Sequence, residues 1–148
     1  MSSIKNIFLI PVVFMVVACG ACNEQGMDLP TTKSTAYTPT EEDIVNMHGD
    51  ITNLERFKEF VENVNEDEED AIRIVIYTTE GDAILKDVAY HGDNIKYTVD
   101  TTRDGYGQQE ITTTYCGSVE KVEVNERIDY KVIGCENKID EILLIVDK

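Results

Sequence analysis

Hydrophobic side chains recur mainly with a period of two from Ala71 to the C-terminus, and this repeat is the strongest constraint on the fold. A period of two places alternate side chains on opposite faces of an extended strand. In "IKYTVD", for example, Ile95, Tyr97 and Val99 would share one face. Turn sequences, such as the one around Gly81, separate successive runs. The pattern predicts consecutive, mostly antiparallel strands.

Seven segments carry this strand signal, roughly residues 71–78, 83–90, 95–100, 110–115, 119–124, 128–133 and 142–146. The first is apolar on both faces, which is typical of a central strand. The second and third are joined by His91-Gly92-Asp93-Asn94, a sequence that predicts a hairpin turn.

One segment before the strands has the period of a helix instead. In "ITNLERFKEFVENV", residues 51–64, apolar residues recur at spacings of three and four. These positions are Leu54, Phe57, Phe60, Val61 and Val64. Thr52 and Glu55 match a capping box at the start of this helix. We therefore expect an α+β fold, with one main amphipathic helix packed on a mostly antiparallel sheet of about six strands.

The N-terminus has the pattern of an export signal. Lys5 precedes Ile7 to Ala18, a run of twelve uncharged and mostly apolar residues. A helix needs about 20 apolar residues to cross a bilayer, so this run is too short to span it. Its length is that of a signal-peptide apolar region.

The segment Val16-Val17-Ala18-Cys19 resembles the lipobox of bacterial lipoproteins. The resemblance implies a diacylglycerol on the Cys19 thiol and cleavage before Cys19, which places the chain on the extracytoplasmic face of the cell membrane. Cys22 fits less well, because Cys19 occupies the position three before it. The alternatives are an ordinary secretory signal cleaved nearby or an uncleaved apolar N-terminus.

These features predict a signal peptide over residues 1–18, a lipidated tether over 19–40 and one domain over 41–148. The tether sequence after Cys22 is polar, rich in threonine and interrupted by Pro30 and Pro39. Removal of residues 1–18 leaves 130 of the 148 residues, with 12 basic and 29 acidic side chains and a formal charge of −17. This charge argues against a nucleic-acid partner.

Cys116 and Cys135 lie in the exported part of the chain, where disulfides form and persist, and we expect them to be bonded to each other. A two-residue turn at Asn125-Glu126 would place them opposite each other but would pair valines with charged residues. A three-residue turn pairs the valines better, and a bulge at Gly117 would then restore the alignment of the cysteines.

The loop "DTTRDGYGQQEI", residues 100–111, carries the strongest signal for a metal site. Asp100, Thr102 and Asp104 follow part of the ligand spacing of a calcium loop, but Ile111 replaces the expected glutamate at the twelfth position. These residues are therefore weak candidates, and a glycine-rich hairpin connection explains the loop better. His48 and His91 have the pattern of turn or surface residues. We expect no cofactor.

Several segments together resemble a family of small lipoproteins of Firmicutes, Gram-positive bacteria, that carry domain of unknown function 4362. The segments are the lipobox, "DIVNMHGDITNLERFKEFVENV", "IRIVIYTTEGDAILKDVAYHGDNIKYTVDTTRDGYG" and the two late cysteines. The resemblance runs from Asp43 to the last strand. It implies export and one compact domain, and it implies no activity.

The sequence favours a membrane-anchored, non-enzymatic module that binds a protein or another envelope component at the cell surface. The alternative is a carboxylate-dependent or cation-binding hydrolase that acts on envelope material through the 100–110 loop. A deep pocket with convergent titratable groups would favour the enzyme.

Overall fold

The computed structural model describes residues 36–148, and the predicted signal peptide, Cys19 and Cys22 lie outside this range. The elements in chain order are β1 (Ile44–Met47), β2 (Asp50–Thr52), α1 (Leu54–Asn65), β3 (Asp70–Tyr77), β4 (Ala83–Tyr90), β5 (Ile95–Asp100), β6 (Ile111–Cys116), β7 (Ser118–Val124), β8 (Arg127–Ile133) and β9 (Ile142–Asp147). Within residues 36–148, no helix is both long and apolar enough to cross a bilayer.

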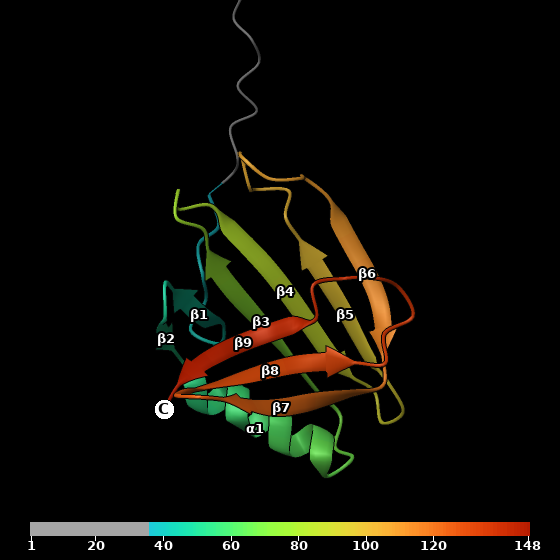
Figure 1. Cartoon of the computed structure of the whole chain (residues 1–148). Helices are drawn as coiled ribbons and strands as arrows, with labels where there is room; N and C mark the ends of the chain where they lie inside the picture. Colours follow the sequence, from blue (N-terminus) through green and yellow to red (C-terminus); the bar gives the residue numbers. More distant parts are fainter. Residues whose placement is uncertain (1–35) are drawn as a thin grey trace, which may run out of the picture. The chain divides into compact units, whose positions relative to one another are not determined.

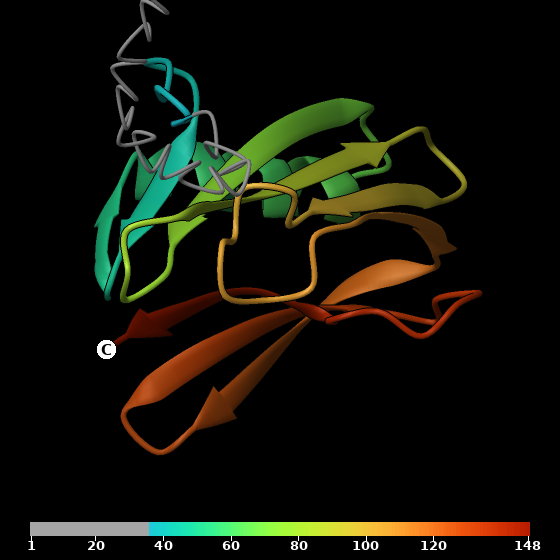
Figure 2. The same ribbon diagram turned by 90° about the horizontal axis from the view of Figure 1, so that it is seen from above.

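The nine strands form two sheets that lie face to face. The larger sheet has six strands in the order β2-β1-β3-β4-β5-β6, and the smaller has three in the order β7-β8-β9. All neighbouring strands are antiparallel except β1 and β3, which run parallel. In Figure 1 the small sheet lies in front of the large one, and Figure 2 shows the two layers from above.

The predicted α+β fold, with a helix covering the sheet, is wrong, because the protein is mostly β. The small sheet covers the inner face of the large sheet, where the helix was expected. Helix α1 is 12 residues long and buries only Phe57, Phe60 and Val64. It contacts β3, β1 and β7, and it closes one end of the space between the sheets (Figure 1).

The chain passes from the large sheet to the small one at Gly117, which separates β6 from β7. The Gly117 N–H donates to the Ile133 carbonyl at 2.9 Å, so β7 begins beside the end of β8. Gly134 follows with a φ of 69°, a conformation that glycine adopts without steric cost. A local pattern of period two is the same in one sheet or two, so this change of sheet was not visible in the sequence.

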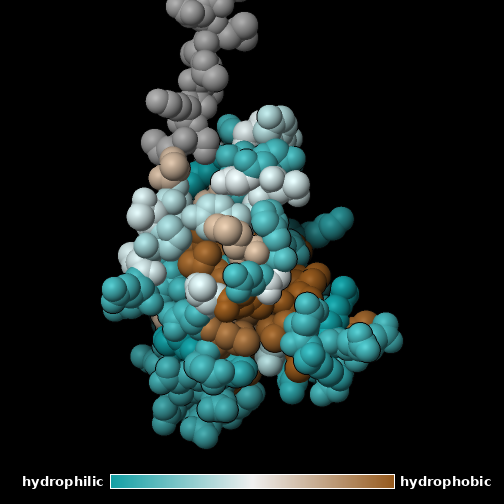
Figure 3. Space-filling model, turned by 90° about the vertical axis from the view of Figure 1, so that its left-hand side faces the viewer, coloured by the Kyte–Doolittle hydropathy of each residue, from teal (hydrophilic) through white to brown (hydrophobic). Residues whose placement is uncertain are grey.

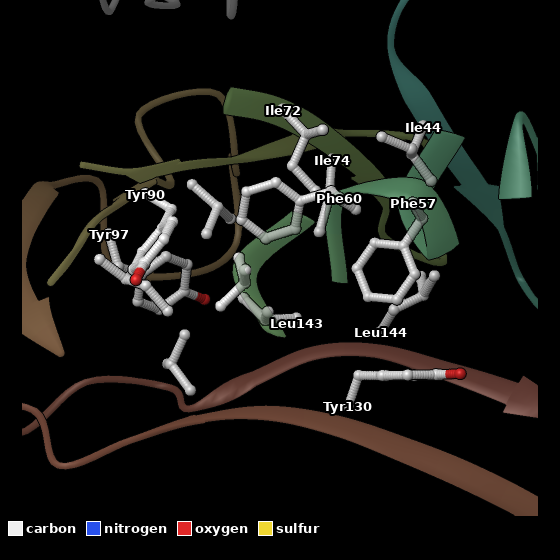
Figure 4. Close-up of a cluster of buried hydrophobic side chains, with 14 of the residues drawn as sticks. Ile44, Phe57, Phe60, Ile72, Ile74, Tyr90, Tyr97, Tyr130, Leu143 and Leu144 are labelled. Carbon is white, nitrogen blue, oxygen red and sulfur yellow. The ribbon is translucent and has the colours of Figure 1, made fainter. Parts of the chain in front are cut away.

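The core lies between the two sheets and the helix (Figure 4). Its residues come from all three layers: Ile44, Phe57, Phe60, Val64, Ile72, Ile74, Val88, Tyr90, Ile95, Tyr97, Val99, Cys116, Tyr130, Val132, Leu143 and Leu144. The rings of Phe57 on α1 and Tyr130 on β8 meet edge to face, with centroids 4.9 Å apart. The sequence patterns identified the buried helix positions correctly.

The core reaches the surface on the side that carries β1 and β2. Figure 3 shows hydrophobic surface gathered at the centre of this side and surrounded by hydrophilic residues. Half-buried apolar side chains extend the core outward from several elements, and they include Ile51, Leu54, Ile76, Ile84, Ile128 and Val146.

The expected capping box is also wrong. The residue before the first helical turn is Asn53, at a φ of 60°, and no side chain caps the helix there. The Asn53 side-chain amide donates instead to the Glu41 carbonyl at 3.2 Å. This contact ties the helix start to the segment that leads into β1.

The β7–β8 hairpin has a two-residue turn at Asn125-Glu126, and the expected three-residue turn is wrong. Val122 lies opposite Asp129 and Val124 opposite Arg127, with no bulge at Gly117. Asn125 takes a φ of 53°, as the tight two-residue turns of hairpins require at their first central position. The buried Asp129 carboxylate is balanced by Arg127, whose Nε lies 2.9 Å from Asp129 Oδ1. Since β7 is an edge strand with half-buried side chains, pairing valine with charged residues carries little penalty.

The predicted disulfide between Cys116 and Cys135 is confirmed. It joins the end of β6 in the large sheet to the segment that follows β8 in the small sheet. The Glu136 N–H donates to the Tyr115 carbonyl at 2.9 Å beside the bond. The sulfur bridge and this hydrogen bond hold one end of the segment between β8 and β9 against the large sheet.

Removal of the disulfide should lower stability without changing the fold. For a closed loop of about 20 residues, the chain-entropy model gives about 3 kcal/mol. We therefore expect the double variant Cys116→Ala, Cys135→Ala to lose about this much free energy of unfolding, measured by urea denaturation. Cys22→Ser is the control and should unfold at the same urea concentration as the parent. An unchanged midpoint in the double variant would contradict the prediction.

Candidate functional site

A cavity of about 520 Å³ opens where β5 and β6 meet their connecting loop. We call it the loop-end cavity. Its lining residues are Val99, Thr101, Gln108, Glu110, Thr112, Lys138, Ile139 and Asp140. Three segments therefore form its walls: the adjacent ends of β5 and β6, the 101–110 loop and residues 138–140 between β8 and β9.

The 101–110 loop is held in shape by its own hydrogen bonds. The Thr101 N–H donates to the Glu110 carbonyl at 2.9 Å and closes the loop at its base. The Thr101 hydroxyl donates to the carbonyls of Gln108 and Glu110. At the tip, the Gly105 N–H donates to Asp82 Oδ2 at 2.9 Å, which ties this loop to the turn between β3 and β4.

A buried lysine fixes the opposite wall of the cavity. Lys86 lies on the inner face of β4, and it is only 4% exposed. Its ammonium group donates to Asp140 Oδ2 at 2.7 Å and to the Ile142 carbonyl. The Asp140 side chain is 58% exposed, so the carboxylate lies between the buried ammonium and the solvent. This ion pair links the large sheet to the segment that leads into β9.

Tyr97 supports the same wall from β5. Its hydroxyl donates to the Asp140 carbonyl at 3.0 Å, and the side chain is fully buried (Figure 4). Burial raises the pKa of the Tyr97 phenol far above its usual value, and the negative charge of Asp140 adds to the effect. The phenol therefore stays neutral and keeps its proton for the hydrogen bond. Both groups of the Asp140 residue, carboxylate and carbonyl, are held by buried donors.

Sequence patterns did not identify Lys86, Tyr97 and Asp140 as site residues. One signal was present for Lys86, because it occupies an inward position of β4 between Ile84 and Val88. A lysine at an apolar position of a strand indicates that a buried acceptor is nearby. That Asp140 is this acceptor could not be read from the sequence, since the two residues are 54 positions apart.

The weak calcium candidates are Asp100, at the base of the 101–110 loop, and Thr102 and Asp104 within it. Their side-chain oxygens form hydrogen bonds to other groups of the loop. Asp100 Oδ1 accepts hydrogen bonds from the N–H and the hydroxyl of Thr102, and Asp100 Oδ2 lies 2.7 Å from an Arg103 nitrogen. Asp104 Oδ1 accepts from the N–H groups of Tyr106 and Gly107. Among residues 36–148, no group of three histidine, cysteine, aspartate or glutamate side chains has the geometry of a metal site.

These bonds also explain the charge state of Asp100. Burial by itself raises the pKa of its carboxyl group, but the hydrogen bonds from Thr102 and Arg103 outweigh this effect. The pKa of Asp100 is therefore lower than that of an ordinary aspartate. Its charge stabilises the loop, which is the role of a turn residue.

The two histidines lie in turns. His48 is exposed at a φ of 57° between β1 and β2, and His91 is exposed in the turn between β4 and β5. Neither lines the loop-end cavity.

Some side chains of the acidic run after α1 have hydrogen-bond partners within the domain. Asp70 binds Arg56 through two hydrogen bonds, and Asp67 accepts a hydrogen bond from the Tyr90 hydroxyl.

A second feature lies on the outer face of the large sheet. Residues Tyr37–Asp43, which we call the strap, cross this face before β1 begins. Two guanidinium groups lie over the Tyr37 ring, with Arg73 Cζ 5.8 Å and Arg103 Cζ 5.7 Å from its centroid. Its hydroxyl donates to Asp43 Oδ2 at 2.8 Å, and the ring packs on an apolar cluster formed by Val75, Ala83 and Leu85.

A cavity of about 540 Å³ lies beside the strap and includes Arg56 and Arg73 in its lining. Both guanidinium groups are already paired through two hydrogen bonds each, Arg56 with Asp70 and Arg73 with Asp87. The bond from Arg73 to Asp87 also raises the pKa of the guanidinium group. The two cations of this cavity are therefore engaged by partners within the protein.

Substitution of the two members of the Lys86–Asp140 pair should have unequal costs. Asp140→Ala leaves the ammonium group buried with the Ile142 carbonyl as its remaining acceptor, and we expect a loss of about 3 kcal/mol in the free energy of unfolding. Lys86→Met leaves a carboxylate that water already reaches, and we expect a loss of about 1 kcal/mol or less. Urea denaturation measures both, and the exposed Lys138→Met serves as the control. Equal losses in the two variants would show that Lys86 is not held as described.

The sequence matches the family described as Domain of unknown function (DUF4362) over residues 41–131. Comparisons with curated proteins and with solved structures returned no match. The matched region contains Lys86, Tyr97 and the 101–110 loop, whereas Asp140 lies beyond it. Because the match covers more than half of the chain, the protein belongs to the DUF4362 family.

Proposed function

We propose that this protein is a lipid-anchored, extracytoplasmic binding module, and that the loop-end cavity is its ligand site. The proposed anchor is Cys19, on the strength of the lipobox pattern at the end of the apolar N-terminal run. Two acyl chains on one thiol are sufficient for stable attachment to a membrane. The domain would then be held at the outer face of the membrane by the polar tether.

The disulfide supports an extracytoplasmic location. Bonds of this kind persist in oxidising compartments and are rare in the reducing cytosol. Cys116 and Cys135 come from different sheets, and their bond fixes the segment that carries Lys138, Ile139 and Asp140. Oxidation of the cysteines after export would therefore also complete the wall of the cavity.

The observation that carries the binding role is the support of Asp140 by two buried donors. The Lys86 ammonium holds the carboxylate and the Tyr97 hydroxyl holds the carbonyl of the same residue. A polar group that is fixed before the ligand arrives loses little entropy on binding. Burial of the Lys86 ammonium group costs free energy. The carboxylate that accepts its hydrogen bond, Asp140, lies in the wall of an open cavity.

The cavity has the size and composition of a small ligand site. Sites for small molecules commonly have volumes of about 300–1,000 Å³ and combine apolar walls with a few fixed polar groups. Val99 and Ile139 supply apolar contacts, and Thr101, Gln108, Glu110, Thr112, Lys138 and Asp140 supply polar ones. We propose a small, polar envelope component, or the exposed part of a larger one, as the ligand.

A hydrolase that uses the carboxylates of the 100–110 loop has less support. Asp100 and Asp104 each accept hydrogen bonds from N–H groups of their own loop, and Asp100 is paired with Arg103. Glu110, which lines the cavity, accepts a hydrogen bond from the Gln108 side-chain amide at 3.3 Å. A general acid or base needs a carboxyl group that is free to reach the substrate. The binding role needs no such group.

The anchor is tested by labelling cells with radioactive palmitate. We expect the parent protein to incorporate label and to sediment with membranes. Cys19→Ala should abolish both, while Cys22→Ser should retain both, because only Cys19 follows the lipobox residues. Label that persists in Cys19→Ala would overturn the proposed anchor.

The ligand site is tested by photo-crosslinking in intact cells. Gln108 lines the cavity and its neighbour Gln109 does not, although both are exposed glutamines. A photo-reactive amino acid at position 108 should give a discrete adduct that is absent with the same amino acid at position 109. Mass spectrometry then identifies the adduct.

A cavity-filling pair provides the control for this experiment. Thr112 lines the cavity, whereas Thr113 faces the opposite side of the same strand and bonds to Thr98. Thr112→Trp should remove the adduct at position 108, and Thr113→Trp should leave it unchanged. An adduct that survives Thr112→Trp, or that forms equally from position 109, would contradict the proposed site.

A further inference from the structure

The chain enters the domain at the same end as the loop-end cavity. Ala36, the first described residue, lines a small hollow together with Gly81, Asp82 and Arg103. These residues belong to the β3–β4 turn and the 101–110 loop, which the Gly105–Asp82 hydrogen bond joins. In Figure 1 both loops lie at the upper end of the domain, and we call this end the loop end.

The strap fixes this point of entry. Tyr37 is held by the two arginines and by the hydrogen bond to Asp43. The same Asp43 oxygen accepts a hydrogen bond from the Thr40 N–H at 2.8 Å, and the Tyr77 hydroxyl donates to the Tyr37 carbonyl at 3.5 Å. The described chain therefore joins the domain at Ala36 and Tyr37, beside the two loops of the loop end, and not at the start of β1.

The opposite end of the domain is far from this point. The turn between β4 and β5 lies at the other end of β5 from the 101–110 loop. Strand β5 has six residues, which at about 3.3 Å each span about 20 Å. Helix α1 closes the space between the sheets at that opposite end (Figure 1).

We infer that the loop end is the membrane-facing end of the domain, so that the loop-end cavity meets its ligand at the headgroup layer of the bilayer. The inference rests on the proposed anchor at Cys19. Residues 20–35 join Cys19 to Ala36, and a chain of this length reaches at most about 60 Å. The attachment point at Ala36 must lie within this reach of the acyl chains, and the opposite end of the domain is about 20 Å farther along the chain's own strands from that point.

The surface of the loop end suits a headgroup layer without net charge. Tyr106, at the tip of the 101–110 loop between two glycines, is 84% exposed. Tyrosine has an apolar ring and a polar hydroxyl, and it is enriched where bilayer and water meet. The same end carries the acidic residues Glu80, Asp82, Asp104 and Glu110, which anionic lipids would repel. We therefore take zwitterionic lipid as the contacting surface.

Fluorescence quenching in phosphatidylcholine vesicles tests this orientation. The chain from Cys19 to Lys148, with Cys22→Ser, is coupled through the Cys19 thiol to a maleimide lipid, so the test does not depend on lipidation in cells. A fluorescent amino acid is placed at Gln109, at the loop end, or at Asp93, in the β4–β5 turn. With a quencher on the lipid headgroups, we expect at least twofold stronger quenching at position 109 than at position 93.

A substitution in the strap provides a second test of the orientation. Tyr37→Ala should release residues 37–42 into the tether and move the attachment point toward β1, so the difference between the two positions should shrink. Tyr115→Ala, on the same sheet face but outside the strap contacts, is the control and should preserve the difference. Equal quenching at both positions, or stronger quenching at position 93, would overturn the orientation. Loss of palmitate labelling in cells would overturn the anchor instead and would leave this measurement unchanged.

Discussion

The stability of this fold depends on burial of the apolar inner face of the six-stranded sheet. That face carries apolar residues from β3, β4 and β5, and the 12-residue helix is too short to cover it. Strands β8 and β9 supply Tyr130, Val132, Leu143 and Leu144 and cover most of the remainder. The change of sheet at Gly117 and the disulfide to Cys135 follow from this need, because the chain must return across the large sheet after β6.

Polar groups inside this layered core are few, and each has a defined partner. Lys86 is the main exception to the apolar inner face, and Asp140 and the Ile142 carbonyl accept its hydrogen bonds. The pair links the two sheets at the end opposite to the helix, next to the loop-end cavity. A structural contact and the proposed ligand site therefore share one residue, so binding at Asp140 and stability of the second sheet are expected to be coupled.

Much of the local structure could be predicted from the sequence. The spacing of Phe57, Phe60 and Val64 identified the buried face of the helix, and alternation identified strands such as β5. The disulfide was predicted from the position of two cysteines in a chain expected to be exported. Four predictions failed: the α+β fold with a single sheet, the capping box, the three-residue turn and the bulge at Gly117. Each of them required knowledge of what lies beside a residue that is distant in the sequence, such as Glu41 beside Asn53.

The sequence by itself determined which residues of α1 and of strands such as β5 face inward, where most strands lie, and the strongly acidic charge of the chain. These properties depend on side-chain chemistry and on the periods of helix and strand, which are local. The tertiary structure alone decided that the strands divide into two sheets, that Lys86 meets Asp140, and that Tyr37 contacts both Arg73 and Arg103. Those contacts join segments tens of residues apart, and their formation depends on how the layers pack to bury apolar surface, which no local pattern specifies.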